Sequence, residues 1–148
     1  MSSYYMESQT SYISKMSEEE KIIFLKVLAN LAYLNNVLDE DEKVFINHMA
    51  VILNISSKKM PEILKQETLE DLTKVVKNIH DRQIALHLIK EACILSNIDG
   101  EMSANEIEFI GQIGLAMGVE LEKIEQISQW VIDRLIWLEE EKVIFEQV

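Results

Sequence analysis

The chain has 148 residues, of which 48% are hydrophobic and 27% charged, so it can form one domain with a buried core. Fourteen Lys and Arg residues against twenty-six Asp and Glu residues give a net charge of −12, which excludes a general binder of nucleic-acid phosphates or anionic membranes. Four glycines and one proline leave few residues for tight turns, so we expect an all-α fold without a glycine-rich phosphate-binding loop.

The N-terminal segment, residues 1–16, is polar and carries tyrosines, and we expect it to be frayed or lightly docked. It lacks the basic start and apolar core of a signal peptide, and no other segment approaches membrane-spanning length. The single Cys93 cannot form an internal disulfide and lies in an apolar run, which predicts a buried, reduced thiol. These features favour a cytoplasmic protein without membrane insertion, whose single domain spans residues 17–148.

Helix start signals divide the first part of this domain. Ser17 and Glu20 form a capping box, and an apolar stripe at three- and four-residue steps follows it. Asp39 and Glu42 form a second box, which begins a helix that we expect to end at Asn54.

The rest of the chain predicts two short helices in its middle, two longer helices and a final long helix from about Leu121 to Phe145. The first short helix starts near Ser56 and Pro61, and the second is capped by Thr68. Asp81 caps the first longer helix, which ends in a turn over residues 97–100. A capping box of Ser103 and Glu106 starts the second longer helix, which stops at Gly118.

An internal repeat becomes visible when the sequence is shifted by 64 residues against itself. Nine apolar or capping positions between Leu31 and Ile55 then meet similar residues, without a gap. Four pairs are identical: Leu31 and Leu95, Glu42 and Glu106, Phe45 and Phe109, and Ile46 and Ile110. We therefore predict a compact bundle of about seven helices, built from two helix-loop-helix repeats over about residues 18–66 and 81–130. The repeats are related by a pseudo-twofold axis, and the long C-terminal helix is added to them.

The loop of the second repeat, residues 97–108, holds four acids and no base. Crowded oxygen ligands suit a hard divalent cation such as Ca²⁺ or Mg²⁺. A standard EF-hand is improbable, because Met102 occupies the position that needs glycine. The same loop is also explained without a metal, as a turn at Gly100 followed by a helix cap with solvated acids.

This loop, the capped helix with Glu106 and Phe109, and the preceding run 92–95 resemble the tellurite-resistance TerB-like family. The resemblance covers roughly residues 18–130, and its best motif lies within 92–119. It implies an internally duplicated cytosolic domain linked to tellurite resistance, chemical stress and phage defence, with acids proposed as a cation site and no known catalytic activity.

By matched position, the resemblance makes Asp99, Glu101 and Glu106 the candidate metal residues, with Asp39 and Glu42 as a weaker second set. The first loop departs from the second, since it has Asn36 and Val37 where the second copy has Gly100 and Glu101. This difference argues against symmetric metal binding.

Catalytic patterns are lacking in the sequence. His48, His80 and His87 have no metal-ligand spacing around them, and no Gly-x-Ser-x-Gly elbow accompanies the serines. We expect no enzyme.

The final helix has more apolar residues than one core-facing stripe needs. We favour burial of a broad face across both repeats. The alternative is a surface for a protein partner or a homodimer, anchored by Trp137 and Phe145.

The leading functional hypothesis is a non-enzymatic, cytosolic interaction or stress-response module of TerB-like type that binds a divalent cation at the loop 97–108. The alternative is an acidic inhibitor that mimics nucleic acid and occupies a basic groove on a partner protein, without binding nucleic acid itself. The negative charge is concentrated in the last third of the chain, where a cation or a basic partner would have to bind. Residues 99–148 hold twelve acids and three bases, whereas residues 1–98 hold fourteen acids and eleven bases.

Overall fold

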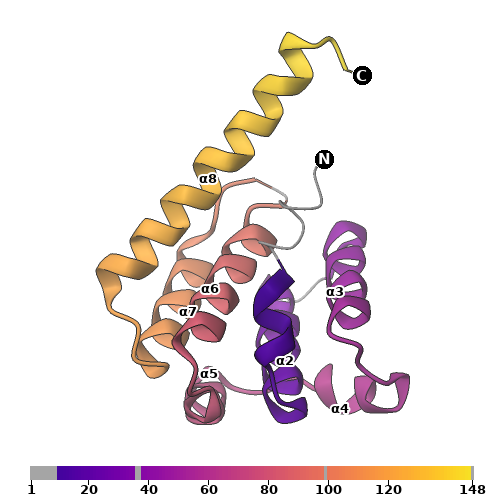
Figure 1. Cartoon of the computed structure of the whole chain (residues 1–148), viewed down its shortest axis with the longest axis vertical. Helices are drawn as coiled ribbons and strands as arrows, with labels where there is room; N and C mark the ends of the chain where they lie inside the picture. Colours follow the sequence, from indigo (N-terminus) through magenta and orange to yellow (C-terminus); the bar gives the residue numbers. More distant parts are fainter. Residues whose placement is uncertain (1–9, 36–37, 99, 148) are drawn as a thin grey trace.

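The computed structural model describes residues 10–35, 38–98 and 100–147, and in these residues the chain is all-helical, as predicted. Seven α-helices are joined by short loops and 3-10 turns (Figure 1). The α-helices are α2 (Glu18–Ala32), α3 (Glu40–Ile52), α4 (Met60–Ile63), α5 (Leu69–Val75), α6 (Arg82–Ser96), α7 (Ala104–Ala116) and α8 (Leu121–Ile144). The 3-10 turns are η1 (Ser11–Lys15), η2 (Tyr33–Asn35), η3 (Ser57–Lys59) and η4 (Val76–Asn78).

The predicted caps begin the helices where the sequence places them. Capping boxes at Ser17, Asp39 and Ser103 start α2, α3 and α7, and each satisfies two backbone N–H groups that the helix leaves unpaired. The side chains of Thr68 and Asp81 accept backbone N–H groups at the starts of α5 and α6. The two short helices expected in the middle of the chain are α4 and α5.

The pairs α2–α3 and α6–α7 agree in their boundaries, since every start and end in the second pair lies 64 residues after its counterpart in the first. Their ends also agree. Asn54, with φ of 55°, and Gly118, with φ of 83°, take the left-handed conformation after α3 and α7. The N–H groups of Ile55 and Val119 both donate back to a helix carbonyl at 2.9 Å. These matches support the predicted duplication, which stays a prediction.

The core lies around α2 and α6, which contact each other in the middle of the molecule (Figure 1). α3 packs on α2, α7 packs on α6, and α5 contacts α7. Apolar side chains of both central helices are completely buried: Phe24, Leu25, Leu28, Leu88 and Ile84. Their burial is the main driving force that holds the two helix pairs together.

The described part of the N-terminal segment is packed more firmly than expected for a frayed end. Tyr12 on η1 is only 2% exposed and stacks on the ring of His87, with centroids 4.1 Å apart. Its hydroxyl donates to Glu91 Oε2 at 3.4 Å, and Glu91 pairs with Lys90 at 3.1 Å. Burial first, and the Glu91 charge second, raise the pKa of Tyr12. Tyr4 and Tyr5 lie outside the described residues.

The long helix α8 packs mainly on α6, and to a smaller extent on α7, through its first half. Its second half extends beyond the helical body (Figure 1). None of the helices in the described part of the chain combines the length and the apolar character that a membrane crossing needs.

Candidate functional site

The acidic loop between α6 and α7 is shaped by its two helix ends. Asn97 follows α6 and donates from Nδ2 to the carbonyl of Cys93 at 2.7 Å. Gly100 has φ of 130°, a conformation that only glycine adopts readily. At the start of α7, Glu106 Oε1 accepts the N–H of Ser103 at 2.7 Å, and Ser103 Oγ accepts the N–H of Glu106 at 3.2 Å. The buried Glu106 carboxylate therefore stabilises the start of a helix.

The predicted metal residues are only partly within the described structure. Asp99 lies outside the described residues, and Glu101 is exposed. Asp39 and Glu42 exchange the same two capping hydrogen bonds as Ser103 and Glu106, at 2.9 and 3.2 Å. Within residues 10–35, 38–98 and 100–147, no three His, Cys, Asp or Glu side chains are grouped so that they could hold a metal ion. The cation site stays a prediction.

The three histidines lie in different surroundings. His48 and His80 are exposed, whereas His87 is half-buried against Tyr12. Burial, and secondarily the nearby Lys90 charge, lower the pKa of His87 to about 4, so the ring is neutral at pH 7. Its Nδ1 is buried without a hydrogen-bond partner in the described structure.

Cys93 is buried, as predicted, with its side chain in the core. Burial raises the pKa of the thiol to about 11, and a hydrogen bond with Ser128 opposes this shift in part. Because the thiolate is the nucleophile, a thiol that stays protonated at neutral pH is poorly suited to covalent chemistry.

The most distinctive surface is the second half of α8, which we call the projecting half and define as residues 136–144. Ile124 and Val131 are the buried residues of α8, and both precede it. The expected burial of a broad face of α8 across both repeats is therefore wrong. The other helices cover only the earlier part of α8 and do not reach residues 136–144. Trp137 is 63% exposed, and Phe145, directly after the helix, is 70% exposed.

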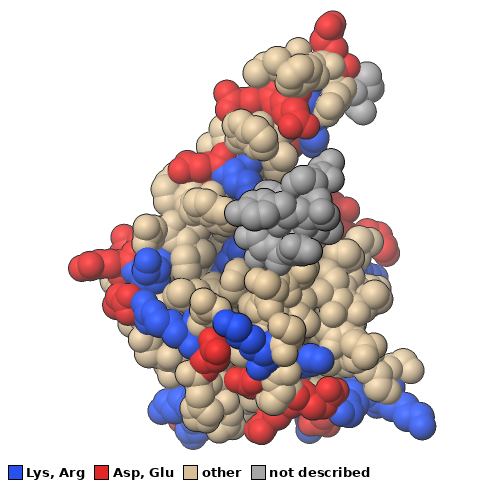
Figure 2. Space-filling view, viewed as in Figure 1, with Lys and Arg blue, Asp and Glu red and all other residues tan. Residues whose placement is uncertain are grey.

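Acidic side chains accompany these apolar residues. Glu139, Glu140 and Glu141 form an uninterrupted run in the middle of the projecting half. Figure 2 shows acids on this end of α8, next to uncharged surface. The surface therefore combines large apolar side chains with negative charge.

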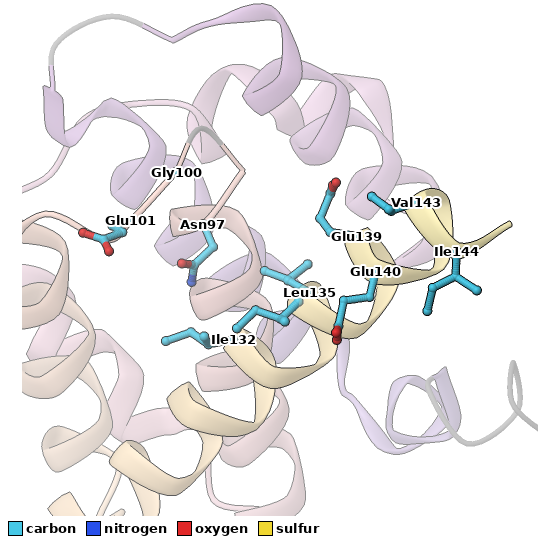
Figure 3. A pocket seen from close by; sticks show the side chains of 10 residues that line it. Asn97, Gly100, Glu101, Ile132, Leu135, Glu139, Glu140, Val143 and Ile144 are labelled. Carbon is cyan, nitrogen blue, oxygen red and sulfur yellow. The ribbon is translucent and has the colours of Figure 1, made fainter. Parts of the chain in front are cut away.

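A groove follows α8 on the side of the α6–α7 loop. One part, of about 730 Å³, lies between α7 and the first half of α8, and a second part, of about 610 Å³, continues along the projecting half. Asn97, Glu101 and Ile132 line both parts, so we treat them as one feature, the α8 groove. Figure 3 shows Asn97 and Glu101 near one end of the second part and Val143 and Ile144 at the other.

The sequence offered Trp137 and Phe145 as anchors in its alternative interpretation of the final helix, but it gave no prediction of this groove. Its walls come from α8, α7 and the α6–α7 loop, and their relative positions depend on tertiary packing. The excess of apolar residues after Val131 was the one local signal that could have pointed to it.

Comparison with known proteins finds no matching family model, no matching curated protein and no matching solved structure.

Proposed function

We propose that this protein is a non-enzymatic interaction module that binds a protein partner through the projecting half of α8. The proposal depends on one observation. Large apolar side chains are exposed on the part of α8 that extends beyond the other helices. Four residues of the projecting half, and Phe145 directly after it, are more than half exposed: Ile136, Trp137, Val143, Ile144 and Phe145. Large apolar side chains exposed close together in the chain are typical of interaction sites.

Two further features support a partner. Aromatic residues often dominate binding energy at interfaces, and Trp137 and Phe145 offer two such anchors at one end of the molecule. A single helix of this length is also marginally stable in water unless its apolar side chains are buried by packing. α6 buries apolar side chains of the first half of α8, and a partner would bury those of the projecting half in the same way.

The surroundings of the polar groups support a non-catalytic role. The thiol of Cys93 is buried and protonated, and the neutral His87 ring is stacked on Tyr12. The TerB-like resemblance, a role in tellurite resistance or stress, and a cytoplasmic location stay predictions, because no match to a known protein bears on them.

Paired substitutions test the proposal. The variant Trp137→Ser with Phe145→Ser removes the two anchors, and Val44→Ser with Val51→Ser is its matched control, since both valines are exposed on α3. Immobilised wild type and both variants are compared for the proteins that they retain from host extract. Urea unfolding verifies that each variant remains folded.

We expect the anchor variant to lose the retained partners and the α3 control to keep them. A homodimer would be revealed in the same series by sedimentation, as self-association of the wild type that Trp137→Ser abolishes. Identical retention by the wild type and both variants, with no self-association, would show that the projecting half binds no protein.

A further inference from the structure

The lining of the α8 groove has a charge of one sign. Five glutamates border its two parts: Glu101, Glu122, Glu125, Glu139 and Glu140. No lysine or arginine is among the described residues that line either part. A groove with negative walls attracts cationic ligands and repels anionic ones.

The floor between these glutamates is mainly apolar. Ile124 and Ile132 lie in its first part, with Ile110 of α7 opposite them. Ile136 and Val143 continue the apolar strip along the projecting half. The groove follows α8 for its 24 residues, which corresponds to a length of about 36 Å at 1.5 Å per residue. An apolar strip of this length is suited to a helix that lies in a groove and inserts side chains at i, i+3, i+4 and i+7.

We propose that the α8 groove binds a basic amphipathic helix of a partner protein, an inference that rests on the proposed interaction function and specifies the partner's chemistry. The apolar face of that helix contacts the isoleucines of the floor. Its Lys and Arg side chains pair with the glutamates along both parts of the groove, and these exposed pairs determine orientation and association rate.

A second copy of the chain fits this surface poorly. The run Glu139–Glu141 lies in the middle of the projecting half, so two projecting halves placed side by side bring their acids together in either orientation. Each copy also carries a net charge of −12. Residues 1–9 of the same chain hold one acid and no Lys or Arg, so their side chains offer no positive charge to the glutamates of the groove.

The test uses two synthetic helical peptides of about 18 residues, one with leucine and lysine in an amphipathic pattern and one with glutamine at every lysine position. Binding to the full-length protein is measured by fluorescence anisotropy of labelled peptide in about 50 mM and about 500 mM NaCl, because salt screens exposed charges. The groove variant is Glu125→Gln with Glu140→Gln. The matched control is Glu19→Gln with Asp41→Asn, which removes the same charge from exposed positions on α2 and α3.

We expect the lysine peptide to bind more tightly than the glutamine peptide at low salt, with a smaller difference at high salt. The groove variant should weaken its binding by about two- to thirty-fold, from two exposed charge pairs, whereas the control should change it less than twofold.

Several results would overturn the inference. Equal binding of the two peptides removes the requirement for a basic partner but leaves the proposed interaction function standing. Equal weakening by the groove and control variants shows attraction to the whole acidic molecule rather than to the groove. Binding of neither peptide, together with self-association that Trp137→Ser abolishes, assigns the surface to a second copy. Binding of neither peptide, with no partner lost in the anchor variant, refutes the interaction function as well.

Discussion

Replacing Gly114 by alanine tests how closely α7 approaches the first turn of α8. A Cβ atom added at Gly114 would lie 2.5 Å from Ile124 Cδ1, 3.0 Å from Ile124 Cγ1 and 3.3 Å from Ile89 Cδ1. The first distance is far inside van der Waals contact, so the α8 side chain or the helix itself has to move. Gly111, on the same helix, is the matched control, because a Cβ there would meet nothing within 4 Å.

The expected magnitudes follow from two opposing effects. Alanine is favoured over glycine in a helix by up to about 1 kcal/mol, and this gain applies at both positions. Forcing an extra methyl group into a packed contact costs about 1–3 kcal/mol, and this cost applies only at Gly114. We therefore expect Gly111→Ala to stabilise the protein by up to about 1 kcal/mol and Gly114→Ala to destabilise it by up to about 2 kcal/mol.

Urea unfolding followed by circular dichroism measures the difference, which should move the transition midpoint by about 0.5–2 M between the two variants. Ile124→Val removes the atom nearest the added methyl group. Adding it to Gly114→Ala should recover about 1 kcal/mol relative to the sum of the single changes. The reasoning is refuted if Gly114→Ala is as stable as Gly111→Ala, because the close contact between α7 and α8 would then not exist.

Two further predictions concern the half-buried ring of His87 and the helix ends. The lowered pKa of His87, about 4, makes its protonation unfavourable in the folded protein, so stability should fall by about 1–3 kcal/mol as the pH drops from about 6.5 through 4. His87→Phe should remove this part of the pH dependence, measured as the urea midpoint against pH, and an unchanged profile contradicts the assignment. Asn54→Gly should stabilise the protein by a few tenths of a kcal/mol and Gly118→Ala should destabilise it by about 1 kcal/mol, because both positions have positive φ. Thermal unfolding compares these two variants, and shifts of the same sign would contradict the shared left-handed helix ends.

Helix positions were predictable because their determinants are local. A capping box such as Ser17 with Glu20 uses side chains three residues apart, and its geometry depends little on the rest of the chain. The same reasoning placed the starts of α3, α6 and α7 correctly, and the positive φ of Gly118 explains the predicted end of α7.

The candidate site was less predictable, because its parts are distant in sequence. The acids of the loop 97–108 fitted either metal ligands or a helix cap in the sequence, and the predicted cap is formed by the carboxylate of Glu106 at the start of α7. Trp137 and Phe145 were proposed as anchors, in the alternative interpretation of the final helix, from residue type alone. Their burial depended on how far the other helices extend alongside α8. The periodicity of apolar residues in the sequence does not give this extent.

The sequence by itself determined the all-α class, the helix boundaries and the concentration of negative charge after residue 98, because these follow from backbone capping, side-chain periodicity and composition. Only the tertiary structure decided which apolar surface stays uncovered. α6 and α7 bury the first half of α8 and end before its second half, so one helix with a continuous apolar pattern becomes core at Val131 and an exposed surface at Trp137. The groove beside it exists because three separate segments pack around that boundary.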